Sequence, residues 1–395
     1  MLLSLTVLLS FLGLSIDVGY QEYVKTRMQA AADAAAMGGA QELRASGPTN
    51  LQASAKGDSA ANGFTDQANG VSVIVNSPPS TGYSTTNSTA VEVLISQTVP
   101  TFFMELIGIS SGTVTARAVA QLGPGTNCLY VLDPSAAGAL SVSGGVTVAF
   151  NCGVMVNSSS ATALSVTGGS HATAPYFDVA GKYTVGGGSS ISPAPITGVA
   201  AASDPFLSLT KPTVPAICTY TNKSVGNGAT TTLTQGTYCG GINIGGGSHV
   251  TFSGGTYILK GGGLTLSNGA TITGSGVTFF NTAGGGYSYG PIVLNGGTTV
   301  SMSAPPTGSM AGILFFQDSS VGAAAASSIS NGATAVMNGA LYFPTTALTF
   351  SGGSSSAYTI IVADTLNFSN GATLNNNYSS LPGGSPVKGG PLLSE

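Results

Sequence analysis

Few side chains beyond residue 123 could do chemistry. The aspartates of this glycine-rich region stand singly along the chain, and the region contains no arginine. No two carboxyl groups recur at the spacing of the region's repeat, so the sequence predicts no acid–base pair of the kind that cleaves polysaccharides. With two histidines in the chain, no Ser-His-Asp arrangement is indicated either. We therefore predict no catalytic residue and no cofactor. The aspartates are Asp133, Asp178, Asp204, Asp318 and Asp364.

Four cysteines are the next candidates. Cys128 and Cys152 are 24 residues apart, and Cys218 and Cys239 are 21 apart. Four cysteines allow three pairings, and these two separations, each close to one repeat, favour Cys128–Cys152 and Cys218–Cys239. A four-cysteine zinc site is the alternative, but zinc ligands usually come in closely spaced pairs. Disulfides would place the region in an oxidising compartment.

The two histidines share one position of the repeat. His171 and His249 each lie five residues after an apolar position, where the other copies carry Thr or Ser. Stacked side by side they could bind a metal. Because Ser190 takes the same position between them in the sequence, we expect a polar column on the surface and no metal site. The other members of the column are Thr147, Ser190, Thr271, Thr299, Thr334, Ser355 and Thr373.

The repeat itself is clearest in Leu264–Ile272. An apolar marker residue is followed by Gly or Asn two positions later and by Gly three positions later. Since only Gly accepts a positive φ freely, each copy should be a strand, a sharp corner and another strand. The markers are Val142, Val166, Val185, Ile244, Leu266, Leu294, Ile329, Phe350 and Phe368, and the glycines are Gly145, Gly169, Gly188, Gly247, Gly269, Gly297, Gly332, Gly353 and Gly371.

Most marker spacings lie near twenty residues, which indicates a solenoid. We predict a mainly β fold, a right-handed parallel β-helix over residues 123–378, with each turn burying its marker against the next. A row of β-hairpins is the alternative. One spacing, from Val185 to Ile244, is 59 residues and contains a Pro-rich excursion at 192–216, which should wrap around or protrude from the solenoid. Residues 379–395 are expected to be an irregular tail.

The chain begins with a run of apolar residues, 1–16, that ends at Asp17. It is slightly short for a membrane span and lacks the basic start and cleavage site of a signal peptide. The helical pattern continues beyond it into an alanine-rich stretch, so a transmembrane anchor is favoured over a cleaved signal. A few further residues upstream would complete the span.

Residues 17–122 read as a small α+β module with a long N-terminal helix. Gly47 and Pro48 should end that helix, and a second helix should follow at 51–63. Strands are predicted at 71–75, 91–95 and 113–120, with a short helix at 99–108.

Residues 16–43, IDVGYQEYVKTRMQAAADAAAMGGAQEL, resemble the N-terminal segment of TadE/TadG-like Flp pilus-assembly proteins. In that family an apolar anchor leads into Asp-x-Gly, a Tyr, a basic residue and an Ala-Ala-Asp-Ala run. The segment VEVLISQTVPTFFMELIGISSGTVTARAVA resembles the next segment of TadG-like proteins, so the resemblance covers the first third of the chain. The matching positions include Asp17, Gly19, Tyr23, Arg27, Gln29, Ala31, Ala32, Asp33, Ala34, Ala35 and Ala36.

The composition limits the partners. The net charge is −4 with 6% charged residues and no basic patch, which argues against nucleic acid. The resemblance implies a non-enzymatic, pilus-assembly-like protein, held in a bacterial inner membrane by its N-terminal helix with its bulk extracytoplasmic. Its partners would be the membrane and pilus-assembly or envelope proteins. Two alternatives stay open: a polysaccharide-active β-helix enzyme, and a surface protein that binds glycans through its Thr/Ser face.

Overall fold

The structure is a computed structural model that describes residues 2–395 except 125, 296, 323–324, 331–334 and 353–354. Of residues 2–10, 12, 45–46, 124 and 369 it describes the backbone alone. The chain forms two compact units. Unit 1 comprises residues 1–124, 207–209 and 388–395, and unit 2 comprises residues 125–206 and 210–387. Most of unit 2 is therefore an insertion into unit 1.

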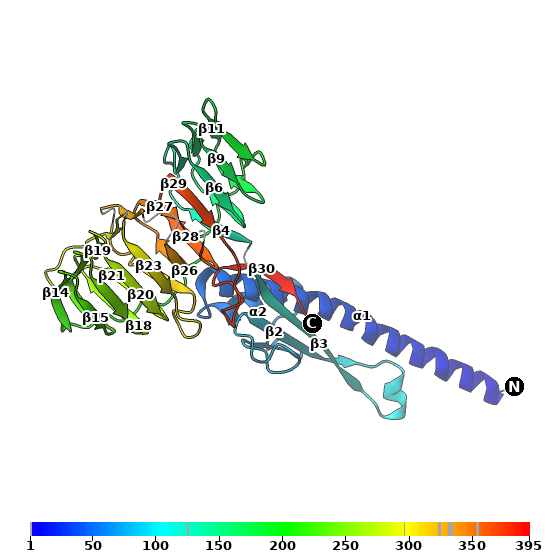
Figure 1. Ribbon diagram of the computed structural model, residues 1–395. Coiled ribbons are helices and arrows are strands. Elements are labelled where there is room, and N and C mark those ends of the chain that lie inside the picture. The colour runs from blue at the N-terminus through cyan, green and yellow to red at the C-terminus, as the bar shows by residue number, and fades with distance from the viewer. Residues whose placement is uncertain (1, 125, 296, 323–324, 331–334, 353–354) are drawn as a thin grey trace. The chain divides into compact units, whose positions relative to one another are not determined.

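Unit 1 is a long helix packed on a small antiparallel sheet (Figure 1). Two expectations were wrong here. The helix predicted at 99–108 is a single 3-10 turn, η1, because the preceding strand runs on to Pro100. The tail expected to be irregular contains a strand, β30, which pairs with β3. The sheet order is β1-β2-β3-β30, and the elements are α1 (Leu2–Ser46), α2 (Leu51–Ala61), β1 (Val71–Asn76), β2 (Ala90–Pro100), η1 (Met104–Ile107), β3 (Ser111–Pro124) and β30 (Lys388–Leu393).

Small residues let α1 approach its neighbours closely. Met28, Ala31 and Ala35 are fully buried in the core that α1 shares with the sheet. A Cβ added at Gly39 would lie 3.1 Å from Val91 and 3.2 Å from Ala55. The alanine-rich run thus supplies helix propensity and a flat packing face together.

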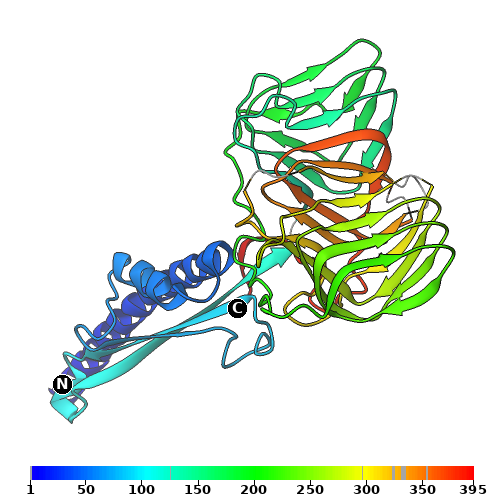
Figure 2. The same ribbon diagram turned by 90° about the vertical axis from the view of Figure 1, so that its left-hand side faces the viewer.

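Unit 2 is a parallel β-solenoid of about 11 turns, so the predicted mainly β, parallel β-helical fold is confirmed (Figure 2). The hairpin alternative is wrong, because every ladder between its named strands is parallel. The strands are β4 (Asn127–Val131), β5 (Leu140–Val142), β6 (Thr147–Phe150), β7 (Gly153–Val156), β8 (Leu164–Val166), β9 (His171–Thr173), β10 (Phe177–Val179), β11 (Tyr183–Val185), β12 (Ser190–Ser192), β13 (Ile196–Thr197), β14 (Tyr220–Val225), β15 (Thr230–Leu233), β16 (Gly236–Ile244), β17 (His249–Phe252), β18 (Gly255–Lys260), β19 (Leu264–Leu266), β20 (Thr271–Ser275), β21 (Val277–Thr282), β22 (Ile292–Leu294), β23 (Thr299–Ser303), β24 (Ile313–Gln317), β25 (Ser327–Ser330), β26 (Val336–Phe343), β27 (Leu348–Gly352), β28 (Thr359–Ala363) and β29 (Leu366–Leu374).

All nine marker residues fall in one ladder column. Their register also adds a tenth member, Val225, which lies inside the 59-residue gap and is missing from the predicted set of markers. The signal was present, since Asn227 and Gly228 follow Val225 at the same offsets as in the other copies. In spatial order the column is Val225, Ile244, Leu266, Leu294, Ile329, Phe350, Phe368, Val142, Val166 and Val185.

That order is not the order of the chain. The chain enters the solenoid at an internal turn, at β4, and coils to the nearer end at β12 and β13. It then returns to the far end, restarts at β14, and coils back until β28 and β29 pair with β4, β5 and β6. At this internal seam the rings of Phe368 and Phe150 pack edge to face, 5.5 Å apart. The expectation that turns stack in chain order was therefore wrong at one place.

Residues 198–219 form the return segment, which lies along the solenoid except at residues 207–209, which belong to unit 1. Its contacts follow the turns in spatial order, from β7 through β26 and β24 to β18 and β16. The Pro-rich excursion therefore carries the chain from one end of the solenoid to the other, mostly past turns that later residues form. The successive contacts are Ala202 with Asn157, Asp204 with Tyr342, Lys211 with Asp318, Pro215 with Lys260, and Cys218 with Cys239.

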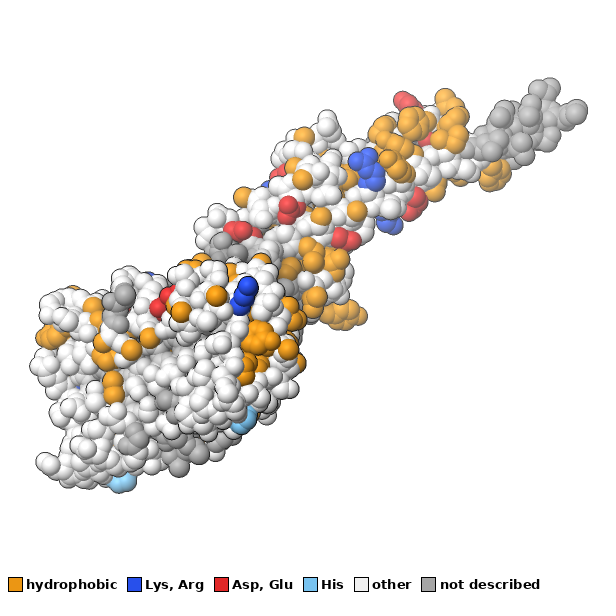
Figure 3. Space-filling model, turned by 90° about the horizontal axis from the view of Figure 1, so that it is seen from above, with side chains coloured by type: hydrophobic (Ala, Val, Ile, Leu, Met, Phe, Trp, Pro, Cys, Tyr) orange, Lys and Arg blue, Asp and Glu red, His pale blue; other side chains and the backbone are white. Residues whose placement is uncertain are grey.

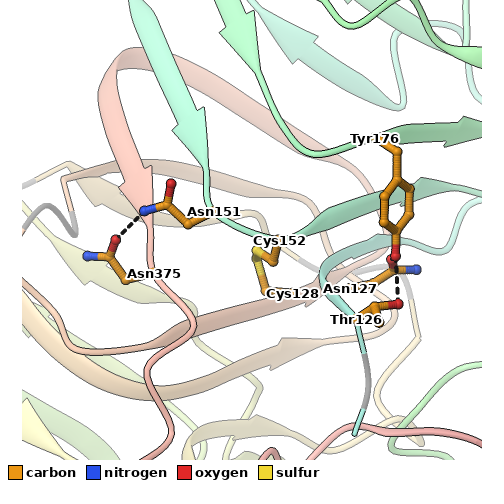
Figure 4. The surroundings of a disulfide bond; sticks show 7 residues. All are labelled: Thr126, Asn127, Cys128, Asn151, Cys152, Tyr176 and Asn375. Carbon is orange, nitrogen blue, oxygen red and sulfur yellow. Dashed lines mark hydrogen bonds between the residues drawn. A yellow bond between two sulfur atoms is a disulfide. The ribbon is translucent and has the colours of Figure 1, made fainter.

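Both disulfides favoured by the spacing are present. Cys128–Cys152 joins the first turn to the second, with Cα atoms 5.6 Å apart, and Figure 4 shows it near the seam contact between Asn151 and Asn375. Cys218–Cys239 joins the end of the return segment to β16, with Cα atoms 5.7 Å apart.

The corner glycines adopt the expected conformation at six of the seven positions that the structure describes. Their φ values lie between +68° and +78°. Gly371 does not, because β29 continues straight through it. Gly332 and Gly353 lie outside the described residues.

Candidate functional site

Asp17, the first residue of the family motif, clasps the η1 turn to α1. Its side chain is 1% exposed. One carboxylate oxygen accepts a hydrogen bond from the backbone N–H of Phe102 at 2.7 Å. The other accepts from Phe103 at 2.9 Å and Met104 at 2.6 Å. Because charge-assisted hydrogen bonds of this kind are strong, they fix the η1 turn beside Asp17 of α1.

Apolar packing reinforces the clasp. Gly13 has no side chain, and a Cβ there would lie 2.7 Å from the ring of Phe103, so the ring rests directly on the helix. Two turns further along, Tyr20 and Phe102 pack edge to face with centroids 5.4 Å apart. Gly108 ends η1 with φ +90° and turns the chain into β3. Helix and turn thus form one surface.

That surface, which we call the apolar end, is exposed. Leu106 and Ile107 at the tip of η1 are 84% and 76% exposed. Figure 3 shows hydrophobic side chains gathered at this end of unit 1, next to the N-terminal part of α1. Exposed apolar patches of this kind usually mark an interaction surface. The apolar end consists of Phe11, Leu14, Ile16, Val18, Tyr20, Tyr23, Phe102, Phe103, Leu106, Ile107 and Ile109.

The remaining motif residues divide between surface and core. Gly19 is exposed with open space around it. Tyr23 is exposed as well, and the Arg27 guanidinium lies 5.8 Å from its ring centroid. Ala31 and Ala32 are fully buried. Asp33 accepts a hydrogen bond from Gln29, whose amide also donates to the backbone of β3, so this pair joins helix and sheet.

The charged cluster of unit 1 is structural. Arg117 pairs with buried Glu92 at 2.7 Å and with Glu395 at 2.9 Å. Burial raises the pKa of Glu92, but hydrogen bonds from Ser80, Thr81 and neighbouring groups outweigh it and hold that pKa well below its usual range. A carboxylate fixed in this way closes the loop between β1 and β2 onto the sheet.

Most aspartates of unit 2 accept hydrogen bonds from other residues of the fold. Asp318 accepts from Lys211 of the return segment at 2.7 Å. Although desolvation raises the pKa of Asp318, the bonds from Lys211 and Ser320 lower it to about 2. Asp204 lies in the return segment and accepts from Tyr342, with its pKa raised by burial. Asp178 lies in β10 opposite Met155 and Ile196.

Asp133 and Asp364 correct the expectation that no two carboxyl groups recur at turn spacing. They lie on either side of the seam, where the Asp133 N–H donates to the Asp364 carbonyl at 2.9 Å. Burial and the charge of Asp133 raise the pKa of Asp364. Chain order could not reveal the pair, because its members come from the first and last turns. The Asp133 carboxylate accepts from the N–H groups of Ser135 and Ala136, which closes its own turn.

The histidines lie in the polar column but far apart in it. His171 stands between Thr147 and Ser190, and bonds Ser190 at 2.8 Å. His249 stands between Thr230 and Thr271, on the other side of the seam. Within the part of the chain that the structure describes, no group of three His, Cys, Asp or Glu could hold a metal. Thr334 lies outside that part, and Thr373 is displaced from the column, since it pairs with Ala149.

The Thr/Ser face carries a shallow hollow of about 400 Å³ over strands β17, β20, β23 and β26. Among the described residues that line it, none is titratable. It offers hydroxyl groups and one amide. The lining residues are Thr251, Thr273, Gly274, Ser275, Ser301, Met302, Ser303, Val336 and Asn338.

Among the helices of the described residues, none is long and apolar enough to cross a membrane. The predicted anchor at residues 1–16 lies largely outside the side chains that the structure describes.

Two protein-family models match the N-terminal third of the chain. Residues 1–42 match a family model described as Flp pilus-assembly TadE/G-like, and residues 24–120 match one described as Tad-like Flp pilus-assembly. No curated protein and no solved structure matches the chain. The first third of the chain is thus TadE/TadG-like, as the motif around Asp17 indicates, and a β-solenoid follows it.

Proposed function

We propose that this protein is a membrane-anchored component of Flp/Tad-type pilus assembly that holds its β-solenoid on the extracytoplasmic side of a bacterial inner membrane. The observation that carries the proposal is the continuity of α1. One helix joins the apolar run at residues 2–16 to the buried alanine face in the core of unit 1. The family matches of the same region support this role.

The two disulfides support an extracytoplasmic location for unit 2. Each closes a loop of some twenty residues between adjacent parts of the solenoid. Such bonds persist in the periplasm and on cell surfaces and are rare in the cytosol. Unit 2 would therefore lie outside the cytoplasm, with α1 leading back to the membrane.

We also propose that the solenoid makes structural or adhesive contacts and is not an enzyme. Asp318 and Asp204 are engaged in fixing the return segment, and Asp133 closes its own turn. These contacts account for three of the five aspartates as parts of the fold. The protein's partners would be other pilus-assembly or envelope proteins.

Membrane fractionation tests the anchor. The full chain is expressed in a bacterium beside a variant with Leu8→Arg and Leu9→Arg and a control with both changed to Ala. We expect the native and Ala forms in the membrane fraction after alkaline extraction, and the Arg form in the soluble fraction, because charges inside an apolar helix are costly. Equal extraction of all three forms would contradict the anchor.

The hollow on the Thr/Ser face favours a second candidate, the binding of neutral glycans. Its lining of hydroxyl groups and the Asn338 amide can exchange hydrogen bonds with sugar hydroxyls. A glycan array with the full chain tests it, comparing Asn338→Ala with Thr230→Ala, an exposed residue of the same face outside the hollow. Binding lost only in the Asn338 variant supports this candidate, and turnover of a polysaccharide that Asp364→Asn abolishes would instead favour the enzyme.

A further inference from the structure

We infer that the η1 turn is a second membrane contact, which rests at the headgroup level beside α1. The inference rests on the membrane anchor proposed above. It adds a specific element, Phe102 to Ile109, and a specific partner, a lipid surface.

The first step is the height of the turn along the helix. Asp17 ends the apolar run, and its three hydrogen bonds hold the backbone of residues 102–104 at that level. Phe103 packs on Gly13 and Phe102 on Tyr20, so the contact spans two turns of α1. When residues 2–16 enter a bilayer, the clasp brings η1 to its surface.

The second step concerns the charge of Asp17. A carboxylate at the end of a span is expensive in an apolar medium unless it is hydrogen-bonded. Here it is 1% exposed and covered by the turn. The apolar surface can therefore continue past it to Val18 and Tyr20. Helix residues 2–16 are about 22 Å long at 1.5 Å per residue, within the roughly 30 Å of a bilayer core, so Asp17 and the turn bound to it would lie at one edge of that core.

The third step is the composition of the turn. Leu106 and Ile107 are 84% and 76% exposed, and Phe102, Phe103 and Ile109 are exposed beside them. Glu105 is exposed in the same turn, which suits the headgroup level and not the hydrocarbon. Tyr20 and Tyr23 add the aromatic residues that favour this interface. A turn that stayed in water would gain no stability from exposing these apolar side chains.

The chain contains no tryptophan, so one introduced Trp reports on one place. Leu106→Trp probes the turn, and Ile74→Trp is the matched control, at a 54% exposed apolar residue of β1 in the same unit. Both sites are exposed, so neither change disturbs the core. The full chain is reconstituted into phosphatidylcholine–phosphatidylglycerol vesicles with and without brominated acyl chains.

Two readouts separate the inference from the anchor. Flotation with the vesicles measures the anchor. For the floated protein we expect brominated lipid to quench Leu106→Trp at least about twofold more than Ile74→Trp, with blue-shifted emission, as for an interfacial aromatic. Flotation with equal quenching at both sites would overturn the turn's membrane contact and leave the anchor standing. A blue shift without quenching would also overturn it, since a protein neighbour would then cover the turn, and failure to float would overturn both.

Discussion

The order of turns in the solenoid can be tested with three valines of the marker column. Val142, Val166 and Val185 come from consecutive turns and have the same role in the repeat. Val142 packs between Phe368 across the seam and Val166. Val185 has Val166 on one side and is 41% exposed on the other, because its turn is the open end.

The costs of truncation follow from this burial. Val→Ala removes two methyl-sized groups, worth about 0.8 kcal/mol each in transfer, plus a cavity term. At fully buried Val142 and Val166 we expect about 2–3 kcal/mol of lost unfolding free energy. At Val185 the exposed fraction and the open side reduce this to about 1 kcal/mol or less.

Equilibrium unfolding in guanidinium chloride, followed by far-UV circular dichroism with the disulfides intact, measures the three costs. Val166 is internal in either stacking order and serves as the reference. If the turns followed chain order, Val185 would be covered by the turn of Val225 and Val142 would lie at an open end. A loss at Val185 equal to that at Val166, with a smaller loss at Val142, would therefore refute the seam.

Three further outcomes follow from single features of unit 2. Gly262→Ala should cost more than about 4 kcal/mol of unfolding free energy, because the added Cβ would lie 2.2 Å from the Gly240 carbonyl oxygen. Gly269→Ala has the same left-handed φ but open space around it, so it should cost about 1 kcal/mol. Equal losses of stability in thermal melts of the two variants would be evidence against the backbone clash. Changing Cys218 and Cys239 together to Ser should remove about 3 kcal/mol of stability relative to the oxidised native protein. Under reduction, which breaks both disulfides, the native and double-variant proteins should be equally stable, and an equal loss with and without reductant would contradict the role of this bond. The folded-state pKa of Asp318, about 2, lies below its ordinary 3.8, so its contribution is present above pH 4 and is lost as the pH falls towards 2; stability of Asp318→Asn should fall less over that window, and parallel curves for the two proteins would contradict the assignment.

Local sequence patterns determined much of the fold. The marker column, the left-handed corner glycines and the pairing of the cysteines all depend on residues within one or two turns of each other, and each turn repeats the same physical requirement. Val225 shows that the pattern also extends into the 59-residue gap between Val185 and Ile244, where no marker was predicted. The motif of residues 16–43 likewise identified the TadE/TadG-like region, because it joins unlike residues at short fixed offsets.

Only the tertiary structure decided the order of the turns. Parallel ladders need no covalent connection between neighbouring turns, so the first and last turns can meet as readily as consecutive ones. From that follow the seam, the Asp133–Asp364 pair and the path of residues 198–219. The same holds for Asp17. Its sequence shows a charge that ends an apolar run, whereas the fold shows that charge covered by residues some 85 positions away. Periodicity therefore determined what each turn looks like, and long-range packing determined which turns and which loops lie together.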